Sequence, residues 1–130
     1  MGEIMQDLAL FSIASERNRW LAARSAAIST NIANADTPGF RARDVAPFES
    51  AMEAAALRPN RTVTGHISPD GPADRNFDLL PRAENAGKHS GNTVNLEMEL
   101  MQLGDVRSQH SMVGGIVSAF HRMLLQSAKG

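Results

Sequence analysis

The sequence predicts a mainly α-helical protein, with two long terminal helices packed as a coiled-coil-like pair and an irregular, partly extended segment between them. Apolar residues recur at alternating steps of three and four near both ends of the chain, which is the spacing of one helical face. The prolines concentrate in the middle instead, where five of the six fall between residues 41 and 90. With 130 residues the chain is expected to form one structural domain, divided into segments 1–40, 41–90 and 91–130.

The first helix is expected from Ile4 to Ala33, a stretch without proline. At about 1.5 Å per residue it would be roughly 45 Å long. Pro38 should end it, because a proline disfavours the helical conformation for the residue before it. Pro38 and Gly39 suit the two central positions of a type II turn, the second of which needs a positive φ. The apolar seam of this helix contains Leu10, Ala14, Leu21, Ile28 and Ile32.

The middle segment carries weaker signals. An alanine- and glutamate-rich run at 48–57 is typical of a short helix. Residues 62–67 and 76–80 are strand candidates, and the Pro-Asp-Gly-Pro sequence at 69–72 indicates a turn between them. Because a lone two-stranded hairpin is marginal in water, the segment is expected to be largely extended unless something holds it.

The second long helix is expected after Thr93, a suitable N-cap residue. Glu97 and Glu99 would then lie near the positive end of its dipole. The Gly114–Gly115 pair either permits close packing or provides a bend, and the pattern does not choose between them. The apolar seam is interrupted by His110 and contains Leu96, Leu100, Leu103, Val106, Val113, Val117, Phe120 and Leu124.

The two seams should pair, because burying one of them contributes on the order of 10 kcal/mol and isolated helices are marginal. A simple intramolecular antiparallel pair satisfies the spacing. It would leave second apolar rows exposed, however, and such rows usually mark an interface. These rows contain Leu8, Phe11, Met101, Met112, Ile116 and Met123. We therefore expect an oligomer, with subunit contacts at Leu10, Leu21, Ile28, Ile32, Leu96, Leu100, Leu103, Val106, Val113, Val117, Phe120 and Leu124.

The composition argues against several classes of protein. The formal net charge is −1, whereas a nucleic-acid binder needs a basic patch that displaces phosphate counterions. Arg17, Arg19 and Arg24 lie close together, but Glu16 lies among them, which favours a solvated helix face. The chain has no cysteine, so disulfides and thiolate metal sites are excluded. Residues 1–12 lack the basic start of a cleavable secretory signal, which predicts cytoplasmic residence or export by another route.

No pattern indicates an enzyme, a cofactor, a metal or a small-molecule substrate. His110 and His121 are about three helical turns apart, which is too far for one zinc ion. His110 is expected to be hydrogen-bonded or at an interface. Glu97 and Glu99 point to different faces of a helix and therefore cannot act on one substrate.

Two motifs carry a resemblance to a known family. Residues 31–40 read Asn-Ile-Ala-Asn-Ala-Asp-Thr-Pro-Gly-Phe, which resembles the signature of flagellar axial proteins, the rod, hook and hook-associated subunits. Residues 90–99 read Ser-Gly-Asn-Thr-Val-Asn-Leu-Glu-Met-Glu and resemble the stretch before the C-terminal helix in proximal rod subunits. The family commonly has Tyr at position 40 and Asp at position 95. The residues carried over are Asn31, Asn34, Asp36, Thr37, Pro38, Gly39 and Phe40 in the first motif and Gly91, Asn92, Thr93, Val94 and Glu97 in the second.

The resemblance implies a structural subunit of the proximal rod in the periplasmic space, exported through the flagellar type III apparatus without a cleaved signal. It implies as partners other copies of the chain, other rod proteins, and membrane-ring and export-gate components at the rod base. The turn at 34–40 would set how the chain leaves the first helix toward neighbouring subunits. The alternative is a helical adaptor or export chaperone that stays in the cytoplasm.

Overall fold

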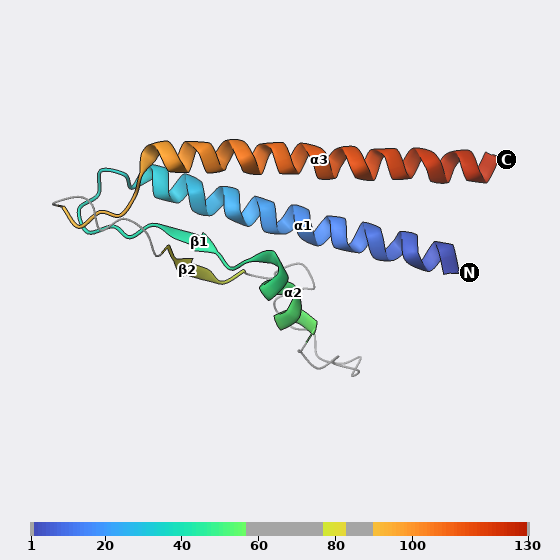
Figure 1. Ribbon diagram of the computed structural model, residues 1–130, viewed down its shortest axis with the longest axis horizontal. Helices are drawn as coiled ribbons and strands as arrows, with labels where there is room; N and C mark the ends of the chain where they lie inside the picture. Colours follow the sequence, from blue (N-terminus) through green and yellow to red (C-terminus); the bar gives the residue numbers. More distant parts are fainter. Residues whose placement is uncertain (1, 57–76, 83–89, 130) are drawn as a thin grey trace, which may run out of the picture.

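The computed structural model describes residues 2–56, 77–82 and 90–129, which form three helices and one two-stranded sheet. The elements are α1 (Gly2–Ala33), β1 (Arg43–Val45), α2 (Phe48–Ala56), β2 (Leu79–Pro81) and α3 (Leu96–Lys129). Helices α1 and α3 lie side by side and antiparallel, so the two ends of the chain are at the same end of the molecule (Figure 1). The sheet and α2 lie along the side of α1 that is turned away from α3 (Figure 1). The predicted class, with long terminal helices that pack together and a less regular middle, is confirmed.

The core lies between α1 and α3 and follows the predicted seams. Leu21 and Ile28 of α1 are 1% and 0% exposed, and Val106 and Val113 of α3 are also buried. Nearer the ends of the chain, Phe11 and Phe120 meet edge to face, with ring centroids 5.9 Å apart. Leu21, Ile28, Val106 and Val113 of the predicted seams therefore lie where α1 and α3 meet, whereas Leu96 and Leu100 of the second seam are exposed.

The start of α3 differs from the prediction. The helix begins at Leu96, and Asn95 is its N-cap, because the Asn95 Oδ1 accepts a hydrogen bond from the Met98 N–H at 3.3 Å. Thr93 lies outside the helix. Its hydroxyl oxygen accepts a hydrogen bond from the Ala42 N–H at 2.8 Å, so it joins the second motif to the chain that leads into β1.

The described sheet contains a strand that was not predicted. Leu79, Leu80 and Pro81 pair antiparallel with Val45, Asp44 and Arg43, so β2 overlaps the strand candidate at 76–80 and pairs with β1. Residues 62–67 and the turn at 69–72 lie outside the described residues. Strand β1 was not predicted because three residues are too short to show an alternating pattern. Helix α2, expected at 48–57, is confirmed at Phe48–Ala56.

Trp20 attaches β1 and α2 to α1. Its indole N–H donates to the carbonyl oxygen of Ala46 at 2.8 Å, and its ring meets Phe48 edge to face at 6.1 Å. The Arg17 guanidinium lies 4.5 Å from the centroid of the Trp20 ring and donates to Gln109 of α3 at 2.7 Å. Arg17 is therefore a packing residue, and the prediction of a solvated face is wrong for it.

Arg24 is likewise only partly exposed, and its guanidinium lies 5.4 Å from the Trp20 ring centroid. Arg19 alone of the three arginines is exposed, and its guanidinium lies 4.0 Å from the Glu16 carboxylate. In the part of the chain that the structure describes, no helix is long and apolar enough to cross a membrane.

Candidate assembly site

The first motif forms the end of α1 and a tight turn. The Phe40 N–H donates to the Thr37 carbonyl oxygen at 3.2 Å, and Gly39 has a φ of 75°, as the predicted turn requires. The Asn34 side chain donates back to the carbonyl oxygen of Thr30 at 2.8 Å, and the same oxygen accepts from the Asn34 backbone N–H at 3.2 Å. Asp36 and Pro38 are exposed on the outside of the turn.

The second motif binds the first through Asn92, which is 2% exposed. Its side-chain N–H₂ faces the carbonyl oxygens of Asn34, Ala35 and Thr37 at 2.9, 2.9 and 2.7 Å. An amide nitrogen has two hydrogens, so the three carbonyls share them. The Asn92 Oδ1 accepts from the Val94 N–H at 2.7 Å, which fixes the orientation of the amide. One buried side chain therefore binds three carbonyl oxygens of the turn that follows α1, two of which also accept backbone N–H groups of that turn.

Backbone hydrogen bonds complete this joint. The Gly39 N–H donates to the Ser90 carbonyl oxygen at 2.9 Å, and the Thr93 N–H donates to the Phe40 carbonyl oxygen at 3.0 Å. Gly91 has a φ of 73°, and a Cβ added there would lie 3.8 Å from the Gly39 Cα. The two motifs, predicted separately, form one structural unit, which we call the motif joint (residues 31–42 and 90–95).

Asn31 ties the motif joint to the helix pair. It is 1% exposed, and its side chain exchanges two hydrogen bonds with the backbone of Arg43 at 2.8 and 3.1 Å. The same amide N–H₂ donates to the Glu99 carboxylate at 3.3 Å. Asn31 therefore fixes β1 and α3 to the last turn of α1 at once.

Glu99 lies in the first turn of α3, near the positive end of the helix dipole as predicted, and it is also a buried acceptor. Its side chain is 1% exposed and forms an ion pair with Arg82, which follows β2. Arg82 also lies 3.1 Å from the Asp44 carboxylate, and Asp44 in turn lies 3.4 Å from Arg24. Two carboxylates thus meet two guanidiniums, which balances the charge in a poorly solvated place.

No pattern in the sequence points to the roles of Arg82 and Asp44. A signal for Glu99 does exist, because Glu99 precedes Val106 and Val113 by one and two heptads and so lies on the seam. A carboxylate on an apolar seam calls for a buried cationic partner. Nothing in the local pattern says that this partner is Arg82.

The residues predicted as subunit contacts fall into three groups. Leu21, Ile28, Val106 and Val113 are buried within the chain itself. Leu10, Ile32, Leu103, Val117, Phe120 and Leu124 are partly buried. Leu96 and Leu100 are 45% and 54% exposed. His110 of the predicted seam is exposed, and so is Glu97 of the second motif.

A second set of large apolar residues is exposed on the outer faces of the helices. On α1 these are Met5, Leu8 and Ile13, and on α3 they are Met101, Met112, Ile116, Met123 and Leu125. Pairing α1 with α3 therefore buries one seam of each helix and leaves these apolar side chains uncovered. Phe11, which was expected to stay exposed, is partly buried against Phe120.

Comparison with known proteins agrees with the resemblance of the first motif. Residues 11–41, which contain the whole first motif, match the family described as "Flagella basal body rod protein". The flagellar basal body rod protein FlgB of Agrobacterium fabrum is 35% identical to this chain, over 99% of each sequence. This chain belongs to the FlgB family of flagellar basal body rod proteins.

Other FlgB proteins are similar to this chain over most of its length. The FlgB of Yersinia ruckeri is 30% identical, over 81% of this chain and 85% of its own. That of Salmonella typhimurium is 32% identical, over 70% of this chain and 72% of its own. As a FlgB family member, the chain is a structural subunit of the flagellar basal body rod.

Proposed function

We propose that this FlgB family subunit is exported unfolded, without a cleaved signal, by the flagellar type III apparatus and assembles into the proximal rod through the outer faces of α1 and α3. The observation that carries the proposal is the exposure of large apolar side chains on these faces. Met5 is 70% exposed, Met101 77% and Met112 61%. Burying one such side chain contributes about 1.5–3 kcal/mol, so several of them favour association.

The make-up of the chain suits passage through a narrow channel. It has no cysteine, so no disulfide has to be broken before export. Its core is small, and several large apolar side chains of the described residues remain exposed in the isolated chain. The cost of ordering the chain is then recovered when neighbouring subunits cover that surface.

The motif joint supplies the rigid corner of the subunit. Asn31 and Asn92 fix the direction of the chain after α1, and the four charged side chains around Glu99 hold the sheet against the helix pair. We assign to this corner the role of setting how the sheet and α2 are presented to neighbouring subunits. The name of the FlgB relatives places them in the basal body rod, which supports other copies and other rod proteins as the first partners. Membrane-ring and export-gate components are further partners at the rod base.

The test uses an exposed residue, because a substitution in the buried seam would also unfold the subunit. Met112→Asp in the host bacterium should abolish swimming while the purified variant keeps the helicity of the parent chain, since Met112 is 61% exposed. Met112→Leu is the matched control, and it should swim normally because it keeps the apolar surface. Normal swimming of Met112→Asp would remove the proposed contact face.

Cell fractionation separates the proposal from a cytoplasmic adaptor or chaperone. The rod subunit should be recovered with isolated basal bodies, and deletion of the type III export gate should leave it in the cytoplasm. Recovery in the cytoplasm alone, in cells with intact flagella, would contradict the proposal.

A further inference from the structure

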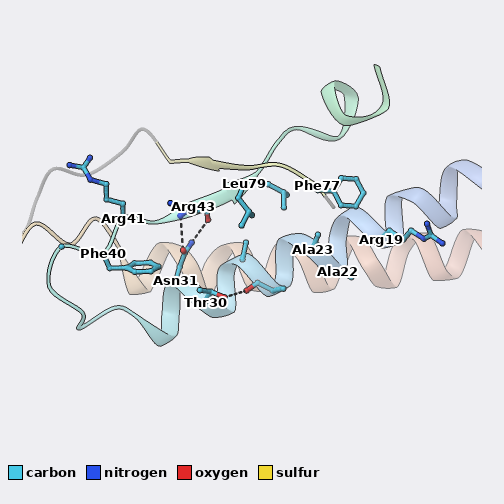
Figure 2. Close-up of a pocket in the computed structure, with 14 residues that line it drawn as sticks. Arg19, Ala22, Ala23, Thr30, Asn31, Phe40, Arg41, Arg43, Phe77 and Leu79 are labelled. Carbon is cyan, nitrogen blue, oxygen red and sulfur yellow. Dashed lines mark hydrogen bonds between the residues drawn. The ribbon is translucent and has the colours of Figure 1, made fainter. Parts of the chain in front are cut away.

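A groove of about 830 Å³ lies between α1 and the two-stranded sheet (Figure 2). Its floor is a row of alanines on α1, and its wall is formed by apolar side chains at and before β2. The residues concerned are Ala22, Ala23, Ala26 and Ala27 on the floor and Phe77 and Leu79 on the wall. At 100° per residue, Ala22 and Ala26 point away from Leu21 and Ile28, so the groove opens on the side of α1 opposite to α3.

Three arginines surround this apolar groove. Arg19 lies at one end, Arg43 lies beside Asn31 in the last turn of α1, and Arg41 lies beyond the end of that helix (Figure 2). All three are exposed. Among the described residues, neither Arg41 nor Arg43 forms an ion pair. The groove is therefore apolar along its length and positively charged near the motif joint.

The outer face of α3 has the complementary character. Glu97, Leu100, Met101, Gly104 and Ser108 are all exposed and lie on one face of its first turns. A Cβ added at Gly104 would meet nothing within 4 Å, so another backbone can approach closely there. This face therefore carries apolar and small residues, and the carboxylate of Glu97 lies near the motif joint.

The contacts inside the chain show which parts of these two faces are at the same level. Asn31 bonds to Glu99 and Arg17 bonds to Gln109, so α1 and α3 run antiparallel with Ala26 at about the level of Gly104. A second copy placed alongside, without a shift along the helix axis, brings its Gly104 to Ala26. It also brings its Glu97 to the end of the groove that carries Arg41.

We propose that α3 of a second copy of this chain lies in the groove between α1 and the sheet, at the same axial level. This proposal rests on the proposed function and names one contact that builds the rod. Small residues face each other at Gly104 and Ala26, Leu100 and Met101 fill the apolar space against the wall, and Glu97 meets the arginines. Because the groove and α3 are on opposite sides of one subunit, the contact is heterologous and each added copy presents a new groove.

Cysteine cross-linking tests this contact directly, because the chain has no cysteine of its own. The double variant A26C/G104C, expressed in the host in place of the parent chain, should form dimers, trimers and longer ladders when isolated basal bodies are oxidised. Each single variant should remain monomeric, because the proposed contact joins two different faces. The control A26C/Q126C should not cross-link, since Gln126 is 22 residues, roughly 33 Å, farther along α3.

Charge exchange gives a second readout. R41E/R43E should lose swimming, and adding E97R should restore part of it, because the exchanged pair attracts again. Unchanged swimming of R41E/R43E would show that the arginines do not serve this contact.

The failures of the two proposals are distinguishable. Dimers of A26C alone or of G104C alone would show a like-with-like contact and overturn the proposed arrangement. Basal bodies that contain A26C/G104C in normal amount but give no ladder would also overturn it, while leaving the rod assignment intact. A chain that never enters basal bodies would overturn the proposed function itself.

Discussion

The side-chain nitrogen of Asn92 lies 2.7 Å from the carbonyl oxygen of Thr37, and this contact joins two segments that are 55 residues apart in the sequence. The same amide donates to the carbonyl oxygens of Asn34 and Ala35. The carbonyls of Asn34 and Thr37 also accept backbone N–H groups within the turn, so Asn92 attaches the second motif to a turn that the first motif closes by itself.

Asn92→Ala should destabilise the isolated subunit. The substitution removes the side-chain donor to the Ala35 carbonyl oxygen and the acceptor of the buried Val94 N–H, so the free energy of unfolding should fall by about 1–3 kcal/mol. Urea denaturation followed by circular dichroism measures this. Asp36→Ala, on the exposed side of the same turn, is the control and should change the free energy by less than about 0.5 kcal/mol.

Glu99→Gln tests the buried ion pair. The variant keeps the size of the side chain but leaves Arg82 without one of its carboxylates, so we expect a loss of about 3 kcal/mol in the free energy of unfolding. The exposed Glu97→Gln is the matched control and should be nearly neutral. Equal stability of the two variants would show that the Glu99–Arg82 pair contributes nothing to the fold.

Gly39→Ala tests the turn. Gly39 has a φ of 75°, which an alanine adopts only with strain, so the substitution should cost about 1–2 kcal/mol even though a Cβ would meet nothing within 4 Å. The thermal midpoint of the purified subunit reports this. A midpoint at or above that of the parent chain would contradict the assigned turn.

Gly115→Ala should have the opposite effect on the isolated subunit. Gly115 lies inside α3, and its added Cβ would meet nothing within 4 Å, so alanine should raise the stability by about 0.5–1 kcal/mol. If the glycine serves close packing by a neighbour, swimming should nevertheless decrease. A variant that is both more stable and fully motile would show that Gly115 has no part in assembly.

Much of the fold can be predicted from the sequence because it is local. The two long helices, the faces on which Leu21 and Val113 lie, and the positive φ of Gly39 all follow from periodicity or from the chemistry of one residue. Each of the two motifs is also a contiguous run of residues and can be recognised in the sequence alone. The division of the chain into segments 1–40, 41–90 and 91–130 stays a prediction.

The long-range contacts could not be predicted in the same way. Strand β1 has three residues, and its pairing with β2 depends on Asn31 and Arg82, which no local pattern connects to it. Thr93 and Asn95 are both good N-cap residues, and the choice of Asn95 follows from the bond that Thr93 makes to the backbone of Ala42. The contact of Asn92 with the first motif likewise requires that residues 90–95 return to the end of α1, which no local pattern shows.

The most direct test of the central claim is the accessibility of the outer helix faces before and after assembly. Met112→Cys, in a chain that has no other cysteine, can be labelled with a maleimide in the purified monomer and in isolated basal bodies. The account predicts rapid labelling of the monomer and strong protection in the basal body. Equal labelling in both would mean that neighbouring subunits leave these apolar faces uncovered, which would contradict it.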